Sequence, residues 1–417
     1  MKFSSFIAGT VVIALSACGG GMQATPSAIG SGNAAAPSLP ALQQTLQTNA
    51  PAKALQPSAA ELGLWPRSGP ARRVCADVPN GYARCQAWIR TDIRGLLRRS
   101  TPSGYSPSDL QTAYALTSFS QGNGDGETVA IVDAYDDPNA ASDLAVYRSQ
   151  FGLPACGTSS GCFTKVKEGT QTNQGWGEEE SLDVDMVSAI CPNCKILLVE
   201  AATSSLANLA TAEKYATAHA GYVSNSWSGN EGTKTYDSDF NVTGVAITAA
   251  TGDNGHNNTA QWPAILPSVT AVGGTTLSSY DPRAETAWSG AGSGCSKVYA
   301  KPSFQSGIST GCSDRAQADT SADANPNTGV AVYDTYVSGG GWLVFGGTSV
   351  ATPIIASVFA LAGKTADNNN TYLYSHASDL NDVTSGKDGS CGAPLCTAGK
   401  GWDGPTGLGT PNGIGAF

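Results

Sequence analysis

The sequence predicts a single α/β domain over residues 106–417, built on a parallel sheet with helices on both faces. Short apolar runs typical of buried strands alternate along it with segments of helical periodicity. Hydrophobic residues make up 41% of the 417-residue chain, enough for a large core, and charged residues only 13%. These values exclude a disordered polyelectrolyte, a coiled coil and a collagen-like rod.

The expected elements alternate between strand and helix. Expected strands are apolar runs bounded by turn residues, and expected helices carry apolar residues at spacings of three and four or are rich in alanine. The predicted strands are 128–132, 195–200, 222–227, 244–250 and 268–272. The predicted helices are 143–151, 178–190, 204–220 and 348–363. This alternation favours parallel strands joined by crossover helices.

The N-terminus has the layout of an export signal. Lys2 precedes a short apolar run, 6–15, which is followed by Leu-Ser-Ala-Cys-Gly at 15–19. That box resembles the cleavage site of bacterial lipoproteins, in which the cysteine carries the lipid. We therefore expect a signal peptide at 1–17 and a lipidated Cys18. An ordinary signal peptide with a chance cysteine is the alternative.

The lipoprotein interpretation implies a location and a form of membrane attachment. Gly19 after the cysteine resembles lipoproteins sent to the outer membrane, so we expect a cell-envelope or secreted protein and favour an outer-membrane lipoprotein. The only membrane contact would be through the N-terminal lipid. Residues 18–62, rich in Gly, Ala, Ser and Pro, are predicted to be a flexible tether.

The ten cysteines after Cys18 fall into five close pairs. An exported chain with an even number of cysteines is typically disulfide-bonded, and we expect bonds between neighbours, although the sequence alone leaves connectivity open. The pairs are Cys75/Cys85, Cys156/Cys162, Cys191/Cys194, Cys295/Cys312 and Cys391/Cys396.

A candidate nucleophile lies in the stretch Gly-Gly-Thr-Ser-Val-Ala-Thr-Pro at 346–353. The glycines permit close approach of backbone to a ligand, and Ser349 would lie in the first turn of a helix, where free amides favour negative charge. An N-cap serine on a buried helix is the alternative. The full stretch resembles the nucleophile segment shared by subtilisins and sedolisins, and the resemblance implies a subtilisin-like parallel sheet with helices on both faces.

A nucleophilic serine needs a base, and histidine is a poor candidate here. Asp133 ends a predicted strand, as the aspartate of a subtilisin would, but none of His219, His256 and His376 lies in a His-Gly-Thr setting. We assign Asp133 no role. A subtilisin-type protease that uses Asp133 and an unidentified histidine stays an alternative.

Carboxylates offer a second base. Glu179 and Asp183 are four residues apart in a predicted helix and thus on one face, where they repel unless they share a proton or point at a site. An acidic first turn that complements the helix dipole is the other interpretation. The segment Glu-Glu-Ser-Leu-Asp, 179–183, resembles the E-x-x-L-D signature of the sedolisin family, the serine-carboxyl peptidases.

Further segments resemble that family in the expected order. Residues 250–255 resemble its oxyanion-hole segment, 261–264 and 269–277 the stretch that follows, and 224–227 the strand that pairs with substrate. The resemblance implies that Ser349 is the nucleophile, Glu179 the general base, Asp183 its proton-sharing partner and Asp253 the oxyanion donor. It also implies substrate contacts at Ser226 and Trp227.

The implied activity is that of an acid-acting endopeptidase on protein or peptide substrates. A glutamate with a pKa near ~4.3 is a weak base at neutral pH but suits acid, where Asp253 also stays protonated. The acidic main body, with 30 acidic and 13 basic residues over 106–417, argues against nucleic acid as a partner. We expect a monomer. An inactive envelope-binding protein on the same scaffold is the alternative from another class.

The C-terminal segment resembles the calcium loop of the same family. The resemblance implies one Ca²⁺, with Asp382, the carbonyls of Val383, Gly399 and Gly401, and Asp403 as ligands. Calcium prefers such oxygen ligands on flexible turns. A Gly/Asp-rich loop without an ion is the alternative.

The chain departs from the family in its prodomain. Sedolisins usually carry a prodomain of full domain size, whereas here only residues 63–105 are available for that role. With eight arginines and two aspartates, this segment could dock on the acidic domain as a reduced propeptide. Arg98-Arg99-Ser100 is a candidate processing point.

Overall fold

The computed structural model describes residues 69–93, 102–232, 234–257, 260–336, 340–363 and 370–417. The predicted signal peptide, Cys18, the tether 18–62 and the processing point at 98–100 lie outside these residues. Within them, no helix is long and apolar enough to cross a membrane.

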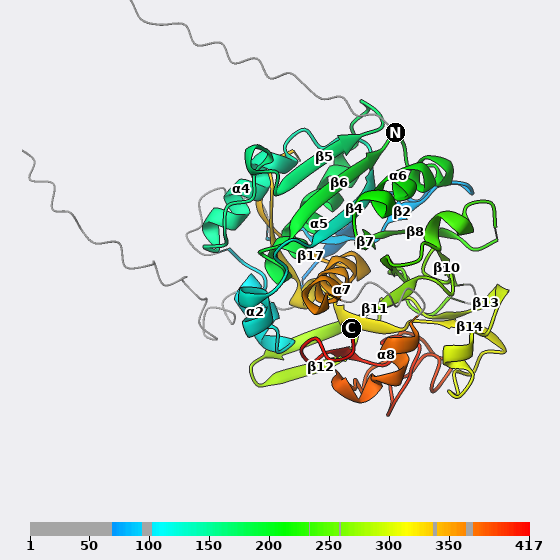
Figure 1. Ribbon diagram of the computed structural model, residues 1–417. Coiled ribbons are helices and arrows are strands. Elements are labelled where there is room, and N and C mark those ends of the chain that lie inside the picture. Colours follow the sequence, from blue (N-terminus) through cyan, green and yellow to red (C-terminus); the bar gives the residue numbers. More distant parts are fainter. Residues whose placement is uncertain (1–68, 94–101, 233, 258–259, 337–339, 364–369) are drawn as a thin grey trace, which may run out of the picture. The chain divides into compact units, whose positions relative to one another are not determined.

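An eight-stranded sheet forms the centre of the described part (Figure 1). Its strands run in the order β12-β11-β9-β7-β4-β6-β5, with β15 paired to β11, and every pairing except β11 with β12 is parallel. The strands are β4 (Thr128–Ala134), β5 (Phe163–Lys167), β6 (Lys195–Ala201), β7 (Tyr222–Asn225), β9 (Ala246–Ala250), β11 (Thr270–Tyr280), β12 (Arg283–Ala287) and β15 (Thr320–Asp323). The predicted parallel sheet is confirmed.

Helices cover both faces of this sheet. One face packs against α6, and the other carries α5 and α7, which also pack against each other (Figure 1). The helices are α2 (Pro107–Ala113), α3 (Thr117–Gly122), α4 (Ala140–Gln150), α5 (Gln174–Ile190), α6 (Leu206–His219), α7 (Thr348–Ala362) and α8 (Thr371–Ser375). All four predicted helices are present.

Two of the predicted boundaries differ for local reasons. Helix α5 begins four residues before the predicted start because the side chain of Asn173 accepts hydrogen bonds from the N–H groups of Gly175 and Trp176 and caps it. The predicted strand 222–227 ends at Asn225, and the chain leaves the main sheet at Ser226 to form a separate strand, β8 (Trp227–Asn230).

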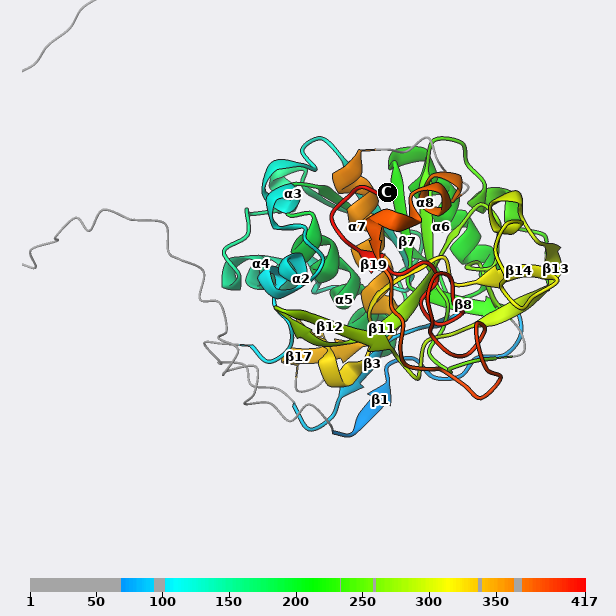
Figure 2. The same cartoon turned by 90° about the horizontal axis from the view of Figure 1, so that it is seen from below.

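The smaller sheets lie beside the main one. They are the four-stranded β1-β3-β17-β16, the three-stranded β10-β8-β2, and the pairs β13-β14 and β18-β19. Their strands are β1 (Ala71–Arg73), β2 (Arg84–Cys85), β3 (Trp88–Arg90), β8 (Trp227–Asn230), β10 (Gln261–Trp262), β13 (Gly294–Ala300), β14 (Asp314–Gln317), β16 (Val330–Asp334), β17 (Gly341–Gly346), β18 (Leu380–Asn381) and β19 (Thr410–Pro411). Figure 2 shows β1 and β3 on the same side of the sheet as β17.

Residues 69–93, which we call the strap, therefore join sheets of the main domain. Strand β2 pairs with β8 and strand β3 with β17, so the strap is bound by backbone hydrogen bonds on both sides of its centre. All five predicted disulfides are present, among them Cys75–Cys85 within the strap.

Candidate active site

The four residues predicted to be catalytic converge between α5, α7 and the carboxyl ends of β7 and β9. Glu179 and Asp183 lie one turn apart on α5, Ser349 is the second residue of α7, and Asp253 follows β9 by three residues. Glu179, Asp183 and Ser349 are 0% exposed and Asp253 is 3% exposed. Crevices at the carboxyl ends of parallel strands are common ligand sites in α/β folds.

Ser349 is positioned by the start of α7. Gly347, whose φ of 104° favours glycine, turns the chain into the helix, so the N–H of Ser349 has no partner within the helix. That N–H donates instead to the carbonyl of Gln86 in the strap, at 3.0 Å. The hydroxyl donates to the carbonyl of Ser226 at 3.0 Å, and rotation about the Cβ–Oγ bond redirects its proton at little cost.

Glu179 and Asp183 form a buried acidic pair beside this hydroxyl. Burial is the main reason that the pKa of each carboxyl lies well above its usual range. The charges of Asp183 and Asp133 raise the pKa of Glu179 further, and the neighbouring Ser349 hydroxyl, as a hydrogen-bond donor, opposes that rise. Asp183 accepts a hydrogen bond from Ser226 Oγ at 2.9 Å. Such a pair favours one shared proton over two negative charges.

Asp253 lies at the start of α7, next to the residue that precedes Ser349. Its Oδ1 accepts hydrogen bonds from the backbone N and Oγ1 of Thr348, both at 2.8 Å. Burial raises the pKa of Asp253 to about 7, against the hydrogen bonds from Thr348 and the charge of Arg73. Its Oδ2 has no hydrogen-bond partner among the described residues. A carboxyl that stays protonated below pH 7 can donate a hydrogen bond from that oxygen.

The two predicted substrate-contact residues differ in what they offer. The carbonyl of Ser226 accepts a hydrogen bond from Gln86 N at 2.9 Å, so its backbone can pair with an extended chain, and in this structure that chain is the strap. The backbone of Trp227 pairs with Cys85, but its side chain is buried among Phe240 and Trp262 and donates to the Val132 carbonyl at 2.9 Å. Trp227 therefore contributes its main chain to this edge and its indole to the core.

No imidazole takes part in this cluster. His219, the last residue of α6, stacks on Tyr215 of the same helix. His376, the residue after α8, stacks on Tyr372 of that helix. His256 bonds to Ser293 Oγ at 3.0 Å. The Ser-His-Asp alternative is therefore not favoured.

Asp133, to which we assigned no role from the sequence, interacts electrostatically with the acidic pair. It is fully buried at the end of β4, and burial followed by the charges of Asp183 and Glu200 raises its pKa well above the usual range. Its negative form is thus disfavoured, and any charge that it carries adds to the rise in the pKa of Glu179.

The C-terminal loop brings the predicted calcium ligands together in part. Gly401 N donates to Asp382 Oδ2 at 2.9 Å and Gly399 N to Asp403 Oδ2 at 3.1 Å, so both carboxylates meet the same short turn. Burial raises the pKa of Asp403 to about 7, and the charge of Asp382 adds to the rise. Neither carboxylate forms an ion pair within the described residues. Such an oxygen-rich loop fits a hard cation.

Several residues of the strap were missed by sequence reasoning. Gln86 meets Ser349, Arg72 forms an ion pair with buried Glu178 at 2.7 Å, and Arg73 donates to the carbonyl of Asp253 at 3.3 Å. The surplus of arginine in 63–105 indicated an electrostatic contact with the acidic domain, and these contacts agree with it. Nothing in the sequence indicated that Gln86 would reach the nucleophile.

Comparisons with known proteins agree with this geometry. The model of the subtilase family matches residues 166–383. Kumamolisin of Bacillus sp. (strain MN-32) is 30% identical over 387 residues, covering 81% of this chain and 67% of kumamolisin. Sedolisin of Pseudomonas sp. (strain 101) is 35% identical over 178 residues, which cover 38% of this chain but only 30% of sedolisin.

A solved structure extends the likeness from sequence to fold. Pseudomonas sedolisin, a serine-carboxyl proteinase solved in complex with two molecules of pseudo-iodotyrostatin, superposes with a TM-score of 0.63 at 25% identity. The superposition covers 75% of this chain and 96% of that one. This chain therefore belongs to the subtilase family and, within it, to the sedolisin-type serine-carboxyl peptidases.

Proposed function

We propose that this serine-type peptidase is an acid-acting endopeptidase that hydrolyses protein and peptide substrates through an acyl-enzyme on Ser349. The observation that carries the proposal is the placement of the buried Ser349 at the start of α7, where α7 packs on α5 and the serine hydroxyl influences the pKa of Glu179, whereas none of the three histidines bonds to it. The carboxyl groups, and not an imidazole, would then activate the serine hydroxyl.

The proposed mechanism gives each carboxyl one task. With one proton already shared within the pair, Glu179 accepts a second as Ser349 Oγ attacks the substrate carbonyl carbon, and a proton then passes to the leaving amine. Asp183 shares the proton of the pair and is oriented by its hydrogen bond from Ser226. Asp253, in its protonated form, donates to the oxyanion together with the N–H of Ser349. Water then hydrolyses the acyl-enzyme.

The same arrangement supports an acidic pH optimum. The oxyanion donor must be protonated, and the pKa of Asp253 is about 7. Above that pH a negative carboxylate would face the developing oxyanion and repel it. We expect hydrolysis to be fastest in acid and to fade towards neutral pH.

A calcium ion is the proposed cofactor. Asp382 and Asp403, with the carbonyls of Val383, Gly399 and Gly401, would hold it in the C-terminal loop. Bound there, the ion would supply positive charge to two converging carboxylates and so stabilise the loop. Both carboxylates accept hydrogen bonds from the turn at Gly399 and Gly401, and this shared contact supports the assignment.

Export and anchoring complete the proposal. The signal at 1–17 and the lipid on Cys18 would place the peptidase in the cell envelope, as an outer-membrane lipoprotein or a secreted protein. Five disulfides among the described residues support an oxidising compartment. We propose a monomer.

Substitution of Glu179 tests the proposal. Glu179→Gln keeps the shape of the side chain but removes the base, so kcat on a denatured protein at acidic pH should fall by about 10²–10⁴-fold. Glu168→Gln, on the loop after β5, is the matched control and should keep wild-type activity. Near-normal hydrolysis by Glu179→Gln would support a histidine-based mechanism, and an inactive wild type would support a binding protein.

A further inference from the structure

A histidine lies against one of the five disulfides. A ring nitrogen of His256 and the sulfur atoms of Cys391 and Cys396 all lie within 4.8 Å of one another, and the two sulfurs form a disulfide. Among the residues that the structure describes, this is the one group of three or more His, Cys, Asp and Glu side chains close enough to share a metal ion. The disulfide therefore has a further potential metal ligand beside it.

The three side chains suit a zinc-class ion once the sulfur–sulfur bond is open. Around a tetrahedral zinc ion, two thiolates and an imidazole nitrogen lie roughly 3.5–4 Å from one another, close to the spacing found here. The cysteines are separated by four residues, which is within the spacing common for pairs of zinc-binding cysteines. Sulfur and nitrogen ligands select zinc over calcium, so this group is chemically distinct from the oxygen ligands at Asp382 and Asp403.

The surroundings of His256 leave one ring nitrogen with a free lone pair. Nδ1 forms a hydrogen bond with Ser293 Oγ at 3.0 Å. The same hydroxyl acts as a hydrogen-bond donor on the carboxyl of Asp388 and opposes the rise in the pKa of Asp388 that burial causes. A hydroxyl has one proton to donate, so Ser293 accepts from Nδ1–H and the lone pair is on Nε2. An imidazole oriented in this way is ready to bind a metal ion.

The disulfide is open to a reductant from one side. Cys391 is exposed, whereas Cys396 is 0% exposed. Thiol–disulfide exchange requires a thiolate to reach one of the two sulfur atoms, and Cys391 offers that access. Both cysteines of the Cys191–Cys194 bond, by contrast, are 0% exposed.

Residues 388–396, which we call the cysteine loop, pack directly on the segment that carries Asp253. His256 follows Asp253 by three residues, and its N–H donates to the Asp388 carbonyl at 3.0 Å. A Cβ on Gly389 would lie 2.7 Å from His256 Cβ and 3.1 Å from Cys396 Sγ, so only glycine fits this contact without a shift. The link between Cys391 and Cys396 therefore closes the loop against which this segment rests.

We infer that Cys391, Cys396 and His256 form a binding site for one zinc-class divalent ion, which opens when a dithiol reductant reduces the Cys391–Cys396 bond. The ion then replaces the covalent bond as the closure of the cysteine loop and ties that loop to the segment that carries Asp253. This inference uses neither Ser349 nor Glu179, so it stands apart from the proposed function.

The reaction balances as a thiol–disulfide exchange followed by metal binding. One thiolate of the dithiol attacks Cys391 Sγ and displaces the Cys396 sulfur, and its second thiolate then closes the reductant's own disulfide and releases Cys391. The reductant loses two electrons, and its two protons pass to the two cysteine sulfurs. One divalent ion displaces both protons to solvent and binds the two thiolates.

A cobalt titration of the full chain tests the inference. Ser349→Ala protein in saturating calcium is reduced with dithiothreitol, freed of reductant without oxygen, and titrated with Co²⁺, whose thiolate complexes absorb in the near ultraviolet. We expect one Co²⁺ per chain, displaced by Zn²⁺, and no such absorbance from the same chain left oxidised. Alkylation and peptide mass measure the opening of the bond. A bond that resists the dithiol, or a reduced protein without the absorbance, would overturn the inference.

Matched variants identify the ligands. The double variant Cys391→Ser/Cys396→Ser should lose the absorbance, whereas Cys156→Ser/Cys162→Ser, which removes a pair of similar spacing, should keep it. His256→Gln should weaken Co²⁺ binding at least about tenfold, and His219→Gln, at an exposed position, should leave it unchanged. Full absorbance in the Cys391/Cys396 double variant, or unchanged affinity in His256→Gln, would place the ion elsewhere.

Thermal unfolding tests whether the ion closes the loop. Zinc bound only to the folded state must stabilise it, so Zn²⁺ should raise the Tm of the reduced Ser349→Ala protein by several degrees. The oxidised protein and the reduced Cys391→Ser/Cys396→Ser variant should show no such rise. A reduced protein that binds Co²⁺ but whose Tm does not respond to Zn²⁺ would show that the ion does not replace the disulfide.

Discussion

At the scale of single residues, the carboxyl group is proposed to act as a base at Glu179 and as a hydrogen-bond donor at Asp253 because the surroundings of the two groups differ. Glu179 lies among other carboxyls, so the pair holds a proton that it can exchange with Ser349. Asp253 is buried, and burial raises its pKa to about 7 against the hydrogen bonds from Thr348 and the charge of Arg73, so it stays neutral in acid as a hydrogen-bond donor. Base and acid are thus assigned by the surroundings of each carboxyl, not by side-chain type.

Asp253 allows these tasks to be tested separately. In Asp253→Asn the amide oxygen still accepts from Thr348, and the amide nitrogen donates at every pH. We expect kcat to fall by about tenfold and the decline of activity near pH 7 to flatten, whereas Asp253→Ala should lose about 10²–10³-fold at all pH values.

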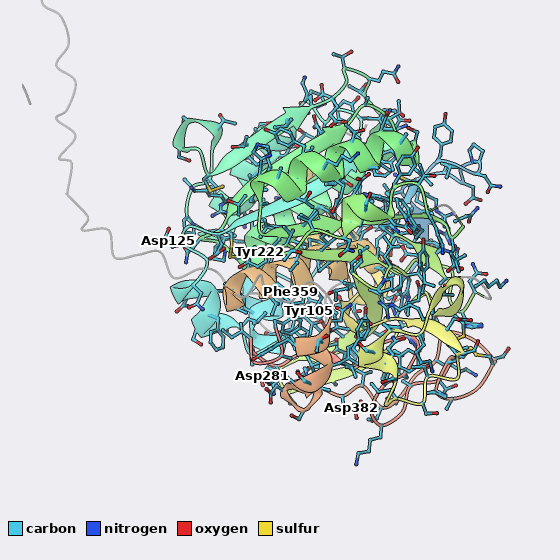
Figure 3. The ribbon with its side chains drawn as sticks, turned by 45° about the vertical axis from the view of Figure 1, so that its right-hand side comes forward. Tyr105, Asp125, Tyr222, Asp281, Phe359 and Asp382 are labelled. Carbon is cyan, nitrogen blue, oxygen red and sulfur yellow. A yellow bond between two sulfur atoms is a disulfide. The ribbon has the colours of Figure 1, made fainter. Side chains whose placement is uncertain are left out.

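The pH–rate profile decides this prediction. Asp125→Asn, at an exposed position labelled in Figure 3, is the control and should keep the wild-type profile. If Asp253→Asn retains the wild-type decline above pH 7, that decline belongs to another group and Asp253 is not the titrating donor.

At the scale of elements, the periodicity of apolar residues predicted those strands and helices that interactions between near neighbours in the sequence determine. The strand at 128–132 and the helix at 348–363 follow from apolar periodicity and flanking glycines, and the structure confirms both. The pairing of β2 with β8 joins residues far apart in sequence, and no periodicity in short segments specifies such a register. The convergence at Glu179 and Ser349 was predicted from family resemblance, whereas the strap across it required the structure.

The C-terminal loop is the element whose stability should depend on a ligand. Asp382 and Asp403 repel each other there, so removing calcium with a chelator should lower Tm by several degrees, and calcium but not magnesium should restore it. Asp403→Asn should abolish the calcium-dependent shift. Differential scanning calorimetry of Ser349→Ala protein avoids self-digestion during the scan.

A matched variant makes the calcium prediction specific. Asp281→Asn changes an exposed carboxylate in the turn between β11 and β12, apart from the loop of Asp382 (Figure 3), and should keep the full shift. An unchanged Tm on chelation of the wild type would contradict the calcium assignment, since a bound stabilising ion must raise Tm.

At the scale of the whole molecule, the fold keeps many carboxyl groups out of water. Burial raises the pKa of Asp137 to about 6, of Asp253 and Asp334 to about 7, and of Glu213 to about 8. Lowered values, as at Asp136 beside Lys165 and Lys167, are fewer among the described residues. The folded state is therefore adapted to bind protons, which agrees with a peptidase that works in acid.

The sign of the stability change follows from proton binding. Between about pH 4, where unfolded carboxyls ionise, and about pH 7, the folded protein holds more protons than the unfolded chain. The free energy of unfolding should therefore fall as pH rises, by about 1.4 kcal/mol per pH unit for each such group. We expect the Tm of Ser349→Ala protein with saturating calcium to be several degrees higher at pH 4.5 than at pH 7.5.

Glu213 offers the most direct test of this prediction, because it lies on α6, on the opposite face of the sheet from Glu179, and can be changed without altering the catalytic cluster. Its carboxyl is fully buried, so Glu213→Gln removes one proton-binding group whose pKa is about 8 without touching the catalytic cluster. The variant should lose stability less steeply with pH than its parent between pH 4.5 and 8, by about one proton in the slope of unfolding free energy. A parent whose Tm stays constant or rises over that interval would mean that these carboxyls ionise freely in the folded state.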